Sequence, residues 1–291
     1  MLDCIKICQK NTDIKRRLID IILLRNHAMQ IKRHCHYKCS LFHNIKNIKY
    51  NNKYPFREVL GGHEFFSALF SFFNLFSTIY SFRKFLKLKR RVNESTNQTL
   101  HFYYKVNLIG LSVNTITWII ATFYHYNVNY FTMILDYLFA FLNLSINLYI
   151  FLVRIFLEKK NYQLTFLINL LSYIFILYAL IHSYNLFNNF SFFVHKFSCS
   201  TLVLFLIMSW YFTVRMRDVK YNKFLIRFIL GSILSSLVEI SDIPPYKYII
   251  DSHSIYHLIS APGIIYYYKY IIHDIKKTFL NEKKKKKIKN S

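Results

Sequence analysis

The sequence predicts an all-α membrane protein, a seven-transmembrane helix bundle with a small N-terminal luminal segment. Apolar side chains make up 54% of the 291 residues, and aromatic side chains make up 19%. The apolar residues gather in separate runs of roughly 18 to 24 residues, the length that a helix needs to cross the hydrocarbon core. Lysine and arginine are concentrated in every second loop between these runs, a pattern typical of multi-pass membrane proteins.

Seven apolar runs qualify as spans, and they divide the chain into three parts. Residues 1–60 form a cysteine-containing N-terminal segment, residues 61–275 the seven-span domain, and residues 276–291 a lysine-rich tail. The predicted spans are 65–82, 104–124, 134–154, 164–186, 192–214, 223–241 and 253–272.

The charges of the loops predict the orientation. Cytoplasmic loops accumulate lysine and arginine, and here the first, third and fifth loops and the tail are basic, whereas the other loops carry at most one cation. We therefore expect a luminal N-terminus and a cytoplasmic C-terminus. The cations are Arg83, Lys84, Lys87, Lys89, Arg90 and Arg91, then Lys159 and Lys160, then Arg215, Arg217, Lys220 and Lys223, and finally Lys276, Lys277 and Lys283 to Lys287.

The N-terminal segment holds two cysteine pairs, Cys4 with Cys8 and Cys35 with Cys39. They admit a zinc knot or two disulfides whose connectivity the sequence leaves open, and a luminal location favours disulfides. The residues before Cys4 lack the charged stretch and continuous apolar run of a secretion signal. We expect either that the first span carries the topology signal or that the true beginning of the protein is missing.

The formal net charge of +25 does not indicate a nucleic-acid partner. The cations lie beside the spans, and the sequence contains no zinc finger or aromatic recognition motif. The lysine tail is either a solvated end or a contact for anionic lipids or coat proteins. No motif implies a soluble partner, so membrane lipids are the expected partners.

His253 and His257 begin the last predicted span, one helical turn apart. On a helix their side chains share a face about 6 Å apart, close enough to hold one metal ion. The alternative is a pair of hydrogen-bonded interior histidines. Ionisable groups at membrane depth are costly and usually mark a functional site, which favours the metal.

The predicted topology brings further ionisable groups to the same depth. His125 ends the second span, Asp136 begins the third, and His182 lies near the end of the fourth. Three imidazoles and a water would form a zinc site with an open catalytic position, and zinc would activate the water and polarise a carbonyl. Asp136 would serve as the general base or orient an imidazole or the water. Such a site at the luminal boundary suits a lipid ester near the headgroup.

Several polar residues have a structural alternative beside a supporting role at this site. Asp251 either caps the last span or supports the histidines. Glu64, Ser67 and Asn74 share one helical face, either as parts of the site or as hydrogen bonds between helices. His182 is either a further pocket residue or a packed interior histidine.

Two neighbouring stretches carry specific motifs, E-I-S-D-I-P-P from Glu239 to Pro245 and I-D-S-H-S-I-Y-H-L-I-S-A-P from Ile250 to Pro262. They resemble the patterns E-x-x-D-x-P-P and L-D-A-H-x-x-W-H-x-x-x-x-P of the PER-like family of post-GPI-attachment factors. Further matches lie between Cys4 and about Asp274: the C-x-Y-x-C pattern at Cys35, the stretch Tyr54-Pro55-Phe56-Arg57, Trp118 before His125, and Asp136-Tyr137.

This resemblance implies zinc ligation by His125, His253 and His257 and a catalytic role for Asp136. It implies removal of the sn-2 acyl chain from the anchor lipid of GPI-anchored proteins, a remodelling step in the endoplasmic reticulum or Golgi membrane. The family is part of the CREST group, with the alkaline ceramidases and adiponectin-type receptors. An amidase acting on ceramide-like lipids is a related alternative, and the two motifs argue against it.

The sequence also departs from the family pattern. The group usually has serine four residues before the first zinc-binding histidine, and this sequence has Ala121 there. Thr122 is adjacent but points about 100° away on a helix. The N-terminal segment has fewer cysteines than the family carries. A catalytically silent lipid receptor or escort factor is therefore the alternative from another functional class.

Overall fold

The computed structural model describes residues 1–16, 18–22, 25–45, 47–50, 53–158, 162–216 and 219–289. Lys159 and Lys160, two cations of the predicted third loop, lie outside these ranges. Regular secondary structure in the described ranges is helical, and the β-pairing found there is confined to isolated bridges in connections. The predicted all-α class is confirmed.

Three short helices form the N-terminal segment, and two disulfides join the first of them to the third. Cys4 is bonded to Cys39, and Cys8 is bonded to Cys35. The two cysteines on each helix are four residues apart and so face the same side, which allows two disulfides to join the helices. Of the two alternatives left by the sequence, the structure contains the disulfides. The helices are α1 (Leu2–Asn11), α2 (Leu18–Ile22) and α3 (His27–Phe42).

Seven long helices follow, and each predicted span lies within one of them. Most of these helices extend beyond the predicted span, because sequence hydropathy detects only their apolar parts. One short helix, α5, stands between the first two. The bounds are α4 (Phe65–Leu86), α5 (Lys89–Asn93), α6 (Gln98–Tyr126), α7 (Tyr130–Glu158), α8 (Tyr162–Asn188), α9 (Phe192–Met216), α10 (Asn222–Ser241) and α11 (Ser252–Lys289).

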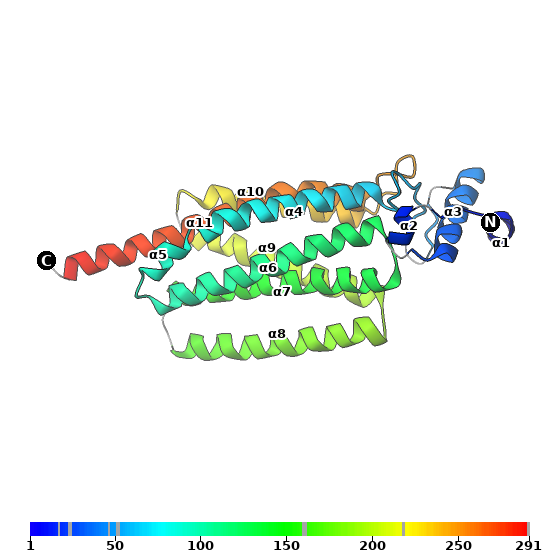
Figure 1. Cartoon of the computed structure of the whole chain (residues 1–291). Coiled ribbons are helices and arrows are strands. Elements are labelled where there is room, and N and C mark those ends of the chain that lie inside the picture. Colours follow the sequence, from blue (N-terminus) through cyan, green and yellow to red (C-terminus); the bar gives the residue numbers. More distant parts are fainter. Residues whose placement is uncertain are drawn as a thin grey trace.

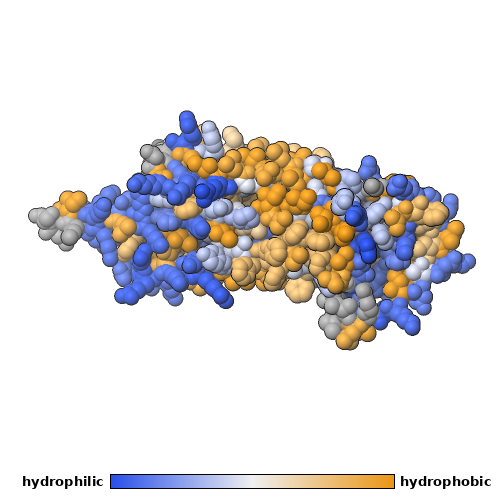
Figure 2. Space-filling model, turned by 90° about the horizontal axis from the view of Figure 1, so that it is seen from above, coloured by the Kyte–Doolittle hydropathy of each residue, from blue (hydrophilic) through white to orange (hydrophobic). Residues whose placement is uncertain are grey.

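Within the described residues, five helices are long and apolar enough to cross a membrane: α4, α6, α7, α9 and α10. The spans predicted at 164–186 and 253–272 lie in α8 and α11, which are also long helices. A multi-pass membrane protein is therefore supported, and the count of seven spans stays a prediction. Figure 2 agrees with this view, since a hydrophobic band covers the middle of the visible face and hydrophilic residues gather toward both ends.

The long helices run side by side along one axis, with the N-terminal helices at one end and the C-terminus at the other (Figure 1). α11 packs between α4 and α10, and α6 packs between α4 and α7. α7 also contacts α8 and α9, and α9 contacts α10. This arrangement brings the end of α6 and the start of α11 to the same end of the bundle.

Small and polar residues allow the central helices to approach closely. A Cβ added at Gly110 of α6 would lie 2.7 Å from Cδ1 of Ile150 in α7, so only glycine fits this crossing without a shift. One side of α4 is lined by buried hydroxyl and amide side chains, which suits an interface between membrane helices. These residues are Ser67, Ser71, Asn74, Ser77, Thr78 and Ser81.

Arg25 fastens the N-terminal segment to the end of the bundle. Its guanidinium is buried, pairs with Asp20 at 2.9 Å and Glu58 at 3.2 Å, and donates to the carbonyl oxygens of Gly61 and Tyr126. Because Tyr126 is the last residue of α6, the segment is tied to the helix end that carries His125.

Candidate metal centre

Three imidazoles meet at the end of the bundle that carries the N-terminal segment. His125 comes from the last turn of α6, whereas His253 and His257 come from the first turns of α11. The Nε2 atom of His257 lies 3.2 Å from that of His125 and 3.0 Å from that of His253, and the third separation is 3.4 Å. The structure brings together the three residues that the family resemblance assigns to zinc.

These separations fit a shared metal ion. Zinc–nitrogen bonds of about 2.0–2.1 Å at tetrahedral angles place the ligand nitrogens about 3.3 Å apart. Glu64 and Glu239 accept hydrogen bonds from Nδ1–H of His125 and His253. A ring that carries its proton at Nδ1 has a lone pair at Nε2, so the Nε2 lone pairs of these two rings face each other. Two facing acceptors repel unless a cation lies between them, so the donor set suits a metal.

Glu64 is the carboxylate behind His125. Its Oε2 lies 2.6 Å from Nδ1 of His125, and its backbone N–H donates to the carbonyl of His125 at 3.0 Å, which fixes the start of α4 against the end of α6. Its Oε1 accepts from Lys53. Burial alone would raise the pKa of Glu64, but Lys53 and His125 outweigh burial and hold that pKa below its ordinary value.

The other two histidines are held differently. Nδ1 of His253 lies 2.9 Å from Oε2 of Glu239 in α10, and the side chain of His253 is 36% exposed, so this ring borders the open side of the site. His257 is buried and meets the edge of Trp118 at 5.5 Å between ring centroids. Its Nδ1 is buried without a partner among the described residues.

Asp136 of α7 lies near enough to interact electrostatically with His125 and His253. In the part of the chain that the structure describes, no donor is hydrogen-bonded to its carboxylate and no cation pairs with it. A carboxylate near two imidazoles and without such a partner is suited to accept a proton. The catalytic role of Asp136 stays a prediction.

Ala121 is buried one turn before His125, at the position where the family resemblance leads us to expect serine. Thr122 does not replace that serine, because its hydroxyl donates to the carbonyl of Trp118 in its own helix at 2.7 Å. This agrees with the direction predicted for Thr122 from helix geometry.

Asp251 and Ser67 contribute to the start of α11. Oδ1 of Asp251 accepts from the backbone N–H of Ser254 at 2.8 Å and also from its hydroxyl, which is the geometry of a helix cap. Ser67 of α4 lies 3.1 Å from the same hydroxyl. The structural alternative proposed for both residues therefore accounts for their contacts.

Asn74 and His182 make contacts between helices. Asn74 donates to the carbonyl of His257 at 2.6 Å and accepts from Ser260 at 2.9 Å, so α4 holds the α11 turn that carries His257. His182 of α8 pairs with His195 of α9, with 3.2 Å between Nε2 and Nδ1. His182 is outside the group of three histidines.

Sequence reasoning missed Lys53 and the contact of Glu239 with His253. Lys53 directly precedes the Tyr54-Pro55-Phe56 stretch, and Glu239 opens the first of the two motifs. Glu239 was visible as part of a motif, whereas Lys53 only adjoins one. Their contacts with the site depend on residues far away in sequence, which local patterns do not reveal.

Most of the chain is similar to proteins of one known family. A family model described as the Per1-like family matches residues 22–275. Post-GPI attachment to proteins factor 3 of Drosophila melanogaster is 28% identical over 223 residues. The aligned part is 76% of this chain and 65% of that relative, so the chain spans about two thirds of the relative's length. No solved structure matches the chain.

Proposed function

The chain belongs to the Per1-like family, and from this premise we propose that it remodels GPI anchors by zinc-dependent hydrolysis. The bond cleaved is the sn-2 acyl ester of the anchor lipid, so the products are a fatty acid and a lyso-anchor. The observation that supports this most is the convergence of three Nε2 atoms within 3.4 Å, with carboxylates behind two of the rings.

His125, His253 and His257 would hold the zinc. A zinc ion bound by three imidazoles supplies a water of lowered pKa and polarises an ester carbonyl. Asp136 takes the proton of the attacking water and passes a proton to the departing glycerol oxygen. Glu64 keeps Nε2 of His125 free to bind, and Lys53 fixes Glu64 from the other side.

The place of the site suits a lipid substrate. The three histidines lie at the end of the hydrophobic helices, where the ester of a phospholipid lies beneath its headgroup. In the predicted orientation this end is luminal, and the two disulfides beside it agree with a luminal location. GPI-anchored proteins are then the substrates, in the endoplasmic reticulum or Golgi membrane.

One observation favours a second candidate, a catalytically silent seven-helix receptor or escort factor. Ala121 leaves the position one turn before His125 without a hydroxyl, and Thr122 is turned away. A metal held by the three histidines would survive this loss, so metal content alone does not separate the two candidates. Turnover of lipid separates them.

The test is mass spectrometry of GPI-anchor lipids in cells that lack their own remodelling phospholipase. The cells are rescued with the parent chain or with His257→Ala, at equal expression. We expect the sn-2 unsaturated chain to be lost with the parent alone. A second variant, His43→Ala, is the matched control, because His43 is exposed at the end of α3, outside the group of three histidines.

Unchanged diacyl anchors with a well-folded parent protein would favour the silent candidate. Remodelling that persists in His257→Ala would contradict the assignment of His257 to the metal. A purified parent chain that binds no zinc would contradict the metal centre itself.

A further inference from the structure

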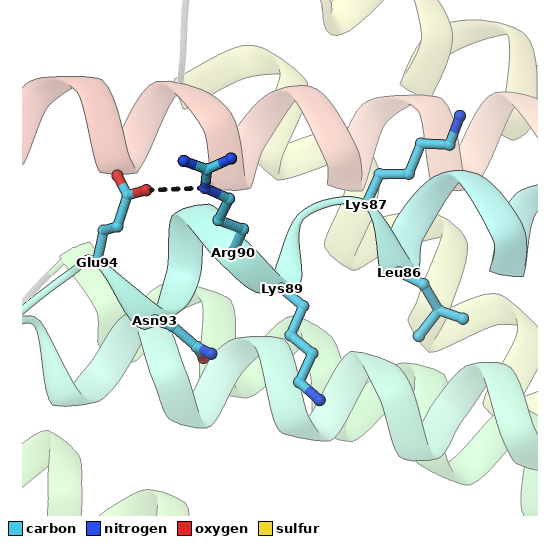
Figure 3. A pocket seen from close by; sticks show the side chains of 6 residues that line it. All are labelled: Leu86, Lys87, Lys89, Arg90, Asn93 and Glu94. Atoms are coloured by element: carbon cyan, nitrogen blue, oxygen red, sulfur yellow. Dashed lines mark ion pairs between the residues drawn. The ribbon is translucent and has the colours of Figure 1, made fainter.

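The short helix α5 lies at the end of the bundle opposite the N-terminal helices (Figure 1). Residues of α5 and of the turn before it line a basic pocket. It has a volume of about 670 Å³ and is open to the outside. Figure 3 shows the Lys87 and Lys89 side chains leaving the turn in different directions, with Arg90 directed toward Glu94. The lining residues are Leu86, Lys87, Lys89, Arg90, Asn93 and Glu94.

Buried apolar residues force these cations outward. Phe85, Leu88 and Val92 are 0%, 2% and 1% exposed, so they anchor the turn and α5 in the core of the bundle. The intervening side chains of Lys87, Lys89 and Arg91 are exposed. The alternation of buried and exposed positions therefore presents a fixed basic edge.

The C-terminal half of α11 holds this edge in place. Glu282 accepts from the backbone N–H of Thr96 at 2.9 Å, from its hydroxyl at 2.8 Å, and from the hydroxyl of Ser95. Burial alone would raise the pKa of Glu282, but the hydrogen bonds from Ser95 and Thr96 lower that pKa to about 2. Glu282 is therefore ionised at neutral pH and braces the residues that follow α5.

The nearby acids are already paired. Glu94 pairs with Arg90 at 3.6 Å and with Lys283 at 3.2 Å, and Glu282 pairs with Lys286 at 3.2 Å. Within the described ranges, no carboxylate pairs with Lys87, Lys89 or Arg91. The edge thus carries uncompensated positive charge that is available to an anion.

We propose that this pocket binds the phosphorylated headgroup of an anionic membrane phospholipid. The pocket begins at Leu86, whose apolar side chain is 42% exposed at the end of α4, so the ligand must approach from the membrane boundary. Because Lys87 and Lys89 diverge, a headgroup with more than one phosphate contacts them better than a single small anion does. The predicted cytoplasmic orientation adds support, since anionic lipids are enriched in that leaflet.

The test measures lipid binding by the purified full chain with native mass spectrometry. The probes are dioctanoyl phosphatidylinositol bisphosphate, dioctanoyl phosphatidylcholine and free inositol trisphosphate. We expect the first probe to bind at least about tenfold more tightly than the second, and the Lys87→Ser/Lys89→Ser/Arg91→Ser variant to lose this preference.

A matched triple variant removes the same charge from the same end of the molecule. Lys220, Lys223 and Arg227 are exposed at the start of α10, and their replacement by serine should change binding by less than about twofold. Equal losses in both triple variants would overturn the proposal in favour of a diffuse charge effect. Equal affinity for free inositol trisphosphate would overturn the assignment to a lipid.

Folding of the variants is checked by thermal unfolding. If the α5 triple variant does not fold, the single charge reversal Lys89→Glu at a residue that lines the pocket replaces it, and binding equal to that of the parent would again overturn the proposal. The measurement involves no hydrolysis, so its outcome is independent of the proposed enzyme activity.

Discussion

Glu64 connects the histidine site to its surroundings through single-residue contacts. One carboxylate oxygen meets His125 and the other meets Lys53, whose ammonium also lies 4.3 Å from the centroid of the Tyr124 ring. A carboxylate behind a metal-binding imidazole fixes the tautomer and orientation of the ring. In the proposed site, Glu64 would therefore orient His125 toward the metal.

Replacing Glu64 with glutamine should weaken zinc binding by roughly 10-fold to 100-fold, because such carboxylates contribute that much to metal affinity. The measurement is competition for zinc between the purified chain and a chelating dye. Glu58→Gln is the control, since Glu58 pairs with Arg25 and is outside the group of three histidines found in the described residues. Unchanged zinc affinity in Glu64→Gln would contradict the role.

Ala121→Ser should raise the turnover of anchor lipid by about tenfold or more, because it restores a hydroxyl next to the reacting ester. The mass-spectrometric assay of anchor lipids measures this. Thr122→Ala should leave turnover unchanged, since the Thr122 hydroxyl is bonded to its own helix at 2.7 Å. If Ala121→Ser behaves like the parent and the parent is active, the hydroxyl is dispensable in this chain.

His63 should make stability depend on pH. Burial and the nearby Arg33 guanidinium lower the pKa of His63 to about 3, Arg25 and Lys53 act in the same direction, and Glu64 opposes them. The unfolded chain binds a proton below about 6.5, whereas the folded chain does not. The contribution of neutral His63 to the free energy of unfolding is therefore fully present above pH 6.5 and is lost progressively as the pH falls toward 3.

Thermal unfolding between pH 7 and pH 4 checks this expectation about His63. The variant His63→Gln should show a shallower loss of stability on acidification than the parent. His43→Gln, at an exposed position, should follow the parent. Parallel curves for the parent and His63→Gln would contradict the assignment.

At the scale of elements, the position of the site depends on how closely α6 approaches α7 and α4 approaches α11. Gly110 allows the first approach, and Asn74 holds the second through the carbonyl of His257. Both contacts fix helices that carry ligands. A substitution at either interface therefore shifts the helices that carry the histidines without contacting the imidazole rings.

Gly110→Leu should lower the free energy of unfolding by roughly 1–3 kcal/mol, because the larger side chain overpacks the interface with Ile150. Gly231→Leu in α10 is the matched control, since an added Cβ there meets nothing within 4 Å. Differential scanning calorimetry of the two variants in one detergent measures the difference. Equal stability of both variants would show that the α6–α7 contact is looser than described.

At the scale of the whole molecule, the disulfide-linked segment supports the loop between α10 and α11. Lys49 pairs with Asp242, the Tyr54 hydroxyl donates to the carbonyl of Asp242 at 2.8 Å, and the Tyr248 hydroxyl donates to the carbonyl of Ser40 at 3.3 Å. This loop leads directly into the first turn of α11, which carries His253. The N-terminal segment thus supports the loop that positions His253 from outside the helix bundle.

Replacing Cys8 and Cys35 with serine should destabilise the N-terminal segment by about 2–4 kcal/mol, because the bond closes a separation of 27 residues. Zinc affinity should fall as well, since the loop before His253 loses part of its support. Limited proteolysis and the zinc competition assay measure the two effects. Cys199→Ser, at the free cysteine of α9, is the control. Zinc binding equal to that of the parent would show that the bundle positions His253 alone.

The sequence by itself determined the all-helical class, the positions of the seven long helices, and the residues that form the histidine group. These features are local or periodic: apolar runs mark helices, and His253 and His257 lie one turn apart on one of them. The predicted topology brought His125 and Asp136 to the same depth, and the family resemblance assigned their roles.

Only the tertiary structure decided which cysteines are bonded and which carboxylates lie behind the histidines. Glu64 and His125 are 61 residues apart, and Asn74 and the carbonyl that it contacts are 183 residues apart. Such contacts follow from how the helices pack, and packing depends on the shapes of all the interfaces together. Thr122 is a local case, because its hydroxyl donates to the carbonyl of Trp118 four residues earlier in the same helix.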